Sequence, residues 1–256
     1  MSITKPYRRL WRPVKGYDLG NEWIYDIPQP SIEYLEDERY VCQSEINSLV
    51  TTAHLIIRDL YALFNYIEPH DSNLGVFSHR LYELFLRTAT EFESNCKAIL
   101  RDNGYAKNER DMNITDYFKI GSVARLSEYR VSFVRWNSSR EFKPFEAWNS
   151  NTYTSLQWYQ SYNNVKHNRF TNFTEASLDN LMNAISGLLC ILHAQYGENM
   201  AGACYEGLST VQSSQDKVKT GTFIIKAPIF PDDEQYDFIW DDIKGQANPV
   251  ENYSFR

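Results

Sequence analysis

The residues best suited to chemistry form one polar run in the second half of the chain. The run is Tyr162-Asn163-Asn164-Val165-Lys166-His167-Asn168-Arg169. An imidazole can move protons near neutral pH. Neighbouring cations and amide groups can hold a phosphate and stabilise developing negative charge. The run therefore suits cleavage of an RNA phosphodiester, a reaction in which the substrate supplies its own 2'-hydroxyl nucleophile.

The spacing of these residues fits a single helix. If the helix continues through His167, the side chains three and four positions earlier share its face. The candidate catalytic residues are His167, Lys166, Arg169 and Asn163, with Asn164 and Tyr162 in support. A plainer interpretation competes with this one, because Lys, His and Arg at a helix end also complement the helix dipole.

Hydrophobic periodicity predicts four helices that would position this run. Apolar residues recur every three or four positions, as one buried stripe per helix requires. The predicted helices cover residues 36–67, 76–102, 155–168 and 174–196. The last is apolar nearly all round, which predicts a central helix in which a lone His193 is a core residue. The expected fold class is mainly α, an antiparallel helical bundle with a small β element near the C-terminus.

Composition divides the chain into three parts. Residues 1–35 are predicted to form an extended arm rich in basic and aromatic residues, and such a stretch most often packs over a domain as a strap. Residues 36–207 form the helical domain. A β-rich run at 222–229 and an acidic tail predict a small β element and a tail packed on the bundle over residues 208–256. A further short strand is predicted where Tyr129, Val131 and Phe133 alternate with polar residues.

The net charge and the spacing of possible metal ligands argue against several classes of function. The net charge of -7 argues against a general nucleic-acid coat protein, although a small basic site on an acidic body remains open. The four cysteines and five histidines show no metal-ligand spacing, so neither a metal nor another cofactor is expected.

The longest apolar run, Leu188 to Leu192, is too short to span a bilayer. Separate, unpaired cysteines favour a reducing compartment, and we expect a cytoplasmic protein without a membrane partner.

The segment from Leu84 to Glu93, Leu-Phe-Leu-Arg-Thr-Ala-Thr-Glu-Phe-Glu, lies on a predicted long helix. Together with a helix ending in a polar His motif and an apolar helix after it, this segment resembles the HEPN-like superfamily over residues of about 40–200. The resemblance implies a helical bundle, commonly dimeric, of the kind found in bacterial defence and toxin systems. Many members are metal-independent ribonucleases, while others are non-catalytic partners or nucleotide-binding modules.

Active members of that superfamily carry an arginine, then a polar residue, and a histidine about one helical turn downstream. By this resemblance His167 takes the place of the histidine, and Asn163 or Asn164 that of the polar residue. No arginine precedes them at the required spacing. The cations that could act in its place are Lys166, Arg169 and, on the facing helix one turn from Glu91, Arg87.

Two functions therefore stay open. The first is a HEPN-like ribonuclease that binds RNA and uses His167 as the proton shuttle. The second is a non-catalytic binding or scaffold protein of the same fold, in which the polar run forms an internal network or a contact with a second copy or another protein. Binding of a nucleotide or small anion by the same cations is a third, weaker option.

Overall fold

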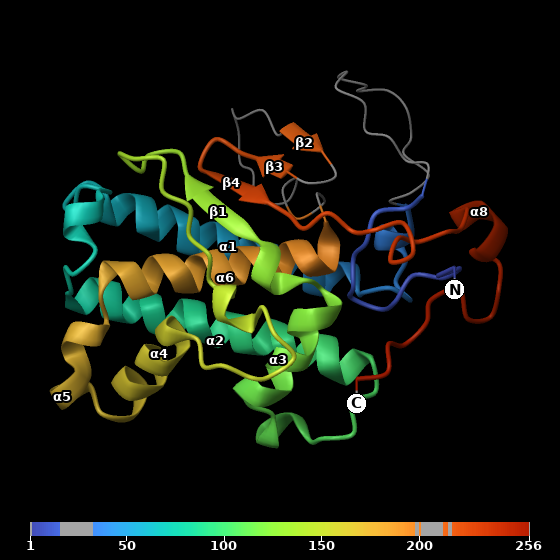
Figure 1. Ribbon diagram of the computed structural model, residues 1–256, viewed down its shortest axis with the longest axis horizontal. Helices are drawn as coiled ribbons and strands as arrows, with labels where there is room; N and C mark the ends of the chain where they lie inside the picture. The colour runs from blue at the N-terminus through green and yellow to red at the C-terminus, as the bar shows by residue number, and fades with distance from the viewer. Residues whose placement is uncertain (1, 16–32, 198–199, 201–211, 215–216, 256) are drawn as a thin grey trace.

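The chain folds mainly into helices, which confirms the predicted fold class (Figure 1). The computed structural model describes residues 2–15, 33–197, 200, 212–214 and 217–255. The longer helices are α1 (Gln43–Leu63), α2 (His79–Asp102), α3 (Ile114–Val123), α4 (Gln157–His167) and α6 (Leu178–Tyr196). Single turns form α5 (Arg169–Asn172) and α8 (Trp240–Ile243). α1 and α2 run in opposite directions along α6, and α4 packs against α2 and α6 (Figure 1).

Side-chain caps decide where two of the main helices begin. The Ser78 hydroxyl accepts a hydrogen bond from the Leu81 N–H at 3.2 Å, and α2 begins one residue after this cap. The Ser177 hydroxyl likewise accepts from the Asn180 N–H at 3.3 Å, so α6 begins at Leu178. A serine cap satisfies an N–H that the first helical turn leaves without a partner.

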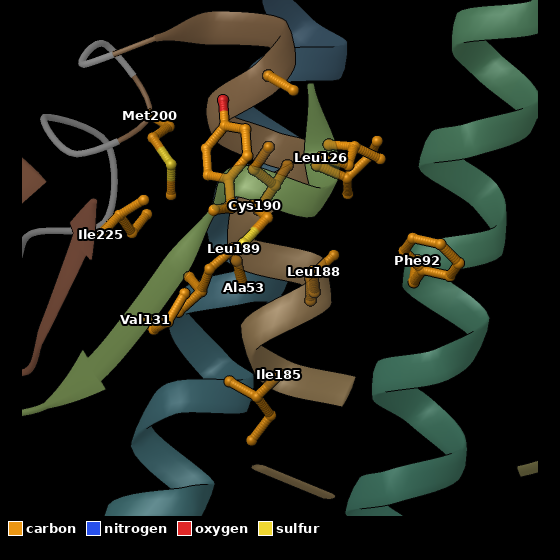
Figure 2. Packing of buried hydrophobic residues seen from close by; sticks show 14 of the residues in the cluster. Ala53, Phe92, Leu126, Val131, Ile185, Leu188, Leu189, Cys190, Met200 and Ile225 are labelled. Atoms are coloured by element: carbon orange, nitrogen blue, oxygen red, sulfur yellow. The ribbon is translucent and has the colours of Figure 1, made fainter. Parts of the chain in front are cut away.

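α6 is the centre of the core, as its apolar sequence predicts. Nearly every side chain from Leu178 to Tyr196 is buried. Figure 2 shows α6 packed between side chains from four other elements. The labelled neighbours on those elements are Ala53 of α1, Phe92 of α2, Val131 of β1 and Ile225 of β4. The bundle and the sheet therefore share one hydrophobic core.

A small antiparallel sheet covers part of this core. Its strands are β1 (Arg130–Phe133), β2 (Gln212–Ser214), β3 (Lys217–Lys219) and β4 (Phe223–Lys226), in the order β1-β4-β3-β2. The predicted strand in the middle of the chain thus joins strands near the C-terminus. Val131, Ile225 and Val218 are directly paired and buried, so this face of the sheet packs inward.

Residues 2–15 run over the end of the bundle and use their basic side chains in the fold. The Arg9 guanidinium is 1% exposed and forms ion pairs with Glu45 and Asp102. Lys15 lies 3.3 Å from Asp237, in the C-terminal part of the chain. None of the helices in the described ranges combines the length and apolar character that crossing a bilayer requires.

Candidate functional site

The polar run lies at the exposed end of α4, where this helix gives way to α5 (Figure 1). Trp158, Tyr162 and Val165 are buried on the inner face of α4, which leaves the last residues of the helix at the surface. Asn168 follows His167 with φ -146° and ψ 79°, a non-helical conformation that ends the helix. The histidine thus occupies the last position of α4, as the interpretation of a helix end predicted.

Lys166 is held by the protein itself. Its Nζ donates to the Tyr162 hydroxyl at 2.9 Å and lies 3.9 Å from a carboxylate oxygen of Glu93 on α2. Glu93 also accepts a hydrogen bond from the Tyr159 hydroxyl at 2.6 Å. Burial works to lower the pKa of Lys166, but the bond to Tyr162 and the charge of Glu93 outweigh it and raise the pKa. These contacts fix α4 against α2 and occupy the ammonium group.

Asn164 has a similar internal role. Its side-chain amide donates to both oxygens of Glu175, at 3.0 and 3.2 Å, and its side-chain oxygen accepts from Gln160 at 3.0 Å. Its backbone carbonyl accepts from the Asn172 side chain at 3.0 Å. These bonds tie the end of α4 to the turns that follow it. Asn163 is half-buried and makes no side-chain hydrogen bond with the described part of the chain.

His167 and Arg169 remain at the surface. The His167 imidazole is exposed and forms no hydrogen bond or ion pair with the residues that the structure describes. The Arg169 guanidinium carbon lies 5.7 Å from the ring centroid of Tyr82 and 5.9 Å from that of Phe170. This cation therefore makes cation–π contacts with two aromatic rings, and its N–H groups form no hydrogen bond with the described residues.

Phe170 begins an aromatic surface that the sequence interpretation missed. Its side chain is 94% exposed on the single turn of α5. Phe173, just after this turn, lies 5.6 Å from Phe77 and 6.1 Å from Tyr82 between ring centroids. We call the residues Phe77, Tyr82, Arg169, Phe170 and Phe173 the aromatic corner. The sequence feature that could have indicated this surface is a single phenylalanine among the polar residues 168–172.

The two supporting residues on α2 lie apart from the polar run. The Arg87 guanidinium donates to the Asp59 carboxylate of α1 at 2.5 Å and lines a groove of about 480 Å³ between α1 and α2. Glu91 is half-buried; burial raises its pKa, and the charge of Arg87 opposes this rise. Within the described residues, no hydrogen bond or ion pair joins Arg87 or Glu91 to α4.

No three side chains among His, Cys, Asp and Glu come together as a metal site in the part of the chain that the structure describes. No family model, curated protein or solved structure matches this chain. The HEPN-like relationship therefore stays a prediction, and the candidate site is judged by its own geometry.

That geometry supports binding more directly than catalysis. Stabilising a transition state requires preorganised donors aimed at the developing charge, in a site that excludes water. Here the amide of Asn164 and the ammonium of Lys166 point at internal carboxylates, and His167 lies on open surface. What the end of α4 offers to another molecule is an imidazole, a stacked guanidinium and an exposed aromatic ring.

Proposed function

We propose that this chain is a non-catalytic binding protein that docks a second copy of itself through the aromatic corner. The observation that carries the proposal is the 94% exposure of Phe170 beside the stacked guanidinium of Arg169. Burying a phenylalanine side chain contributes about 1.5–3 kcal/mol. Aromatic residues and arginine are the types that most often dominate the centre of a protein interface.

The surroundings of Phe170 favour a preformed surface. The bonds from Asn164 to Glu175 and from Lys166 to Tyr162 hold the end of α4 in place before any partner arrives. A surface that is already ordered loses less conformational entropy when it binds. The resemblance to a superfamily whose members are commonly dimeric supports a second copy as the partner.

Sedimentation velocity over a range of protein concentrations tests this proposal. Phe170→Ser removes the exposed ring, and Tyr66→Ser is the matched control because Tyr66 is a comparably exposed aromatic residue, at 88%, beyond α1. We expect the wild-type chain and the control to dimerise. A central interface residue contributes about 2 kcal/mol or more, so Phe170→Ser should weaken the dimer at least about 30-fold. A wild-type monomer up to about 100 µM would overturn the proposal.

A metal-independent ribonuclease is the second candidate function, and one observation favours it. The His167 imidazole is exposed and has no partner among the described residues, so the fold does not use it. Cleavage of varied RNAs in the presence of a chelator, lost in His167→Ala, is the expected result for an enzyme. If Phe170→Ser also abolished cleavage, residues of a second copy would complete the site. RNA that stays intact with the wild-type dimer would rule out this function.

A further inference from the structure

A row of cations crosses three neighbouring strands of the small sheet. Arg130 of β1 pairs directly with Lys226 of β4, and Lys226 pairs directly with Lys217 of β3. Directly paired residues point to the same face of a sheet, and residues two apart on one strand do so too. Lys219 therefore lies on this face with Lys217. We call Arg130, Lys217, Lys219 and Lys226 the cationic face.

Among the described residues, Glu141 is the acidic residue that pairs with cations of this face. The Glu141 carboxylate accepts a hydrogen bond from the Lys226 Nζ at 2.5 Å and lies 3.9 Å from the Arg130 guanidinium. The bond from Lys226 lowers the pKa of Glu141 against the opposing effect of burial. Lys217 and Lys219 are exposed and form no ion pair with the described residues. Lys217 lies directly opposite Lys226, and like charges in this position destabilise a sheet.

We propose that the cationic face binds the phosphodiester backbone of nucleic acid. Neighbouring strands lie about 4.8 Å apart, so the row presents positive charge at regular short intervals. Lysine binds phosphate as a compact point charge, and phosphate contacts supply affinity without reading sequence. This binding role is separate from the aromatic corner and does not depend on it.

The other residues on this face favour nucleic acid over a protein partner. Beside the cations lie Ser132 and Ile224, which are half-buried. A protein interface needs an apolar centre, often aromatic, and within β1, β3 and β4 the outward side of this face has one aliphatic residue, Ile224. Contacts to a phosphate backbone need no such centre. None of the outward residues of β1, β3 and β4 is an aromatic ring on which bases could stack, so binding should be strongly salt-dependent and nearly independent of sequence.

Fluorescence anisotropy with a labelled oligouridine RNA of about 20 nucleotides tests the proposal. Three or four phosphate contacts give a slope of about -2 to -3 for log affinity against log salt, at about -0.7 per contact on a single strand. The wild-type affinity should therefore fall about 20- to 50-fold between 50 and 200 mM salt. No measurable binding at 50 mM salt would overturn the proposal.

A charge-matched pair of variants locates the site. Lys217→Gln/Lys219→Gln removes two cations of the face and leaves the bond between Lys226 and Glu141 intact. Arg58→Gln/Arg110→Gln removes the same charge from two exposed positions. Arg58 lies on α1, and Arg110 lies in the 3-10 turn Glu109–Asp111. We expect the lysine variant to lose at least about tenfold in affinity and about 1.4 in salt slope, and the arginine variant to stay within twofold of wild type.

Three results would contradict the assignment. Equal losses in both double variants would mean that net charge alone drives binding. Competition by polyglutamate as strong as by RNA would assign the face to acidic polypeptides. Affinity that stays unchanged between 50 and 200 mM salt would contradict contacts to phosphate. Thermal melting of the lysine variant provides the folding control, and it should match or exceed wild type because the substitution relieves repulsion.

Discussion

Acidification should destabilise the protein through one buried histidine. His193 is 1% exposed in the middle of the core, on α6. Its Nδ1 lies 2.9 Å from the Tyr129 hydroxyl, and the Trp11 ring packs edge-on against the imidazole at 5.1 Å between centroids. Burial lowers the pKa of His193 from 6.5 to about 3. The folded protein therefore keeps this imidazole neutral at pH values where the unfolded chain protonates it.

The direction and size of the effect follow from this difference. Above pH 6.5 both states hold a neutral imidazole, and the lowered pKa leaves the free energy of unfolding unchanged. As the pH falls from 6.5 towards 3, only the unfolded state takes up the proton, so stability decreases. One proton contributes about 1.4 kcal/mol per pH unit, which amounts to roughly 2 to 3 kcal/mol between pH 6.5 and 4.5.

Urea unfolding of wild type and His193→Gln from pH 7.5 to 4.5 measures this contribution. Glutamine does not titrate, and its side-chain amide can replace the imidazole as the hydrogen-bond partner of the Tyr129 hydroxyl. The substitution leaves every other titratable side chain in place, so the difference between the two proteins isolates His193. The difference in unfolding free energy should shift by roughly 2 to 3 kcal/mol in favour of the variant as the pH falls. A difference that stays constant over this range would refute the assignment of a neutral buried imidazole.

Three further predictions concern single positions. Arg9→Met should cost about 1–3 kcal/mol of unfolding free energy in urea, because it removes a buried guanidinium that binds Glu45, Asp102 and the Tyr196 hydroxyl, while Arg101 stays beside both carboxylates; a loss below about 0.5 kcal/mol would contradict this. Gly197→Ala should lower the melting temperature, because φ is +55° there and a Cβ would collide with the Trp11 ring. His167→Ala should change the unfolding free energy by less than about 0.5 kcal/mol, and a larger loss would show that the imidazole supports the fold.

Periodicity in the sequence was sufficient to predict α1, α2, α4 and α6, but it predicted neither α3 nor all of the helix ends. The apolar stripe of the first long helix predicted a start at residue 36, whereas α1 begins at Gln43. The Asp37 carboxylate binds both the backbone N–H and the guanidinium of Arg39, at 2.8 Å and 2.7–2.8 Å. Such local bonds offer the backbone an alternative to helix, and a hydrophobic pattern does not register them.

The predicted start of the last helix at Thr174 was wrong for a related reason. Thr174 and Ser177 are both acceptable cap residues, and sequence preference alone does not choose between them. In the structure Thr174 lies in a 3-10 turn, and the Ser177 hydroxyl accepts the capping bond.

The polar run shows a similar limit of sequence-based prediction, because the carboxylate beside Lys166 belongs to Glu93 on another helix. The residue types at a helix end show which ligands a cation there could bind. Tertiary contacts decide whether a carboxylate of the protein itself already binds that cation.

The cationic face shows how an apolar pattern can fix the position of charges. Val218, Ile225 and Val131 must face the core, and side chains alternate along a strand, so Lys217, Lys219 and Lys226 must share the outer face. Lysine on an edge strand commonly protects a sheet against pairing with other chains. That explanation does not apply to β3 and β4, which are interior strands in the order β1-β4-β3-β2. Lys226 is bonded to Glu141, whereas Lys217 and Lys219 form no ion pair with the described residues, so these two lysines of β3 are the cations that a ligand outside the fold would bind first.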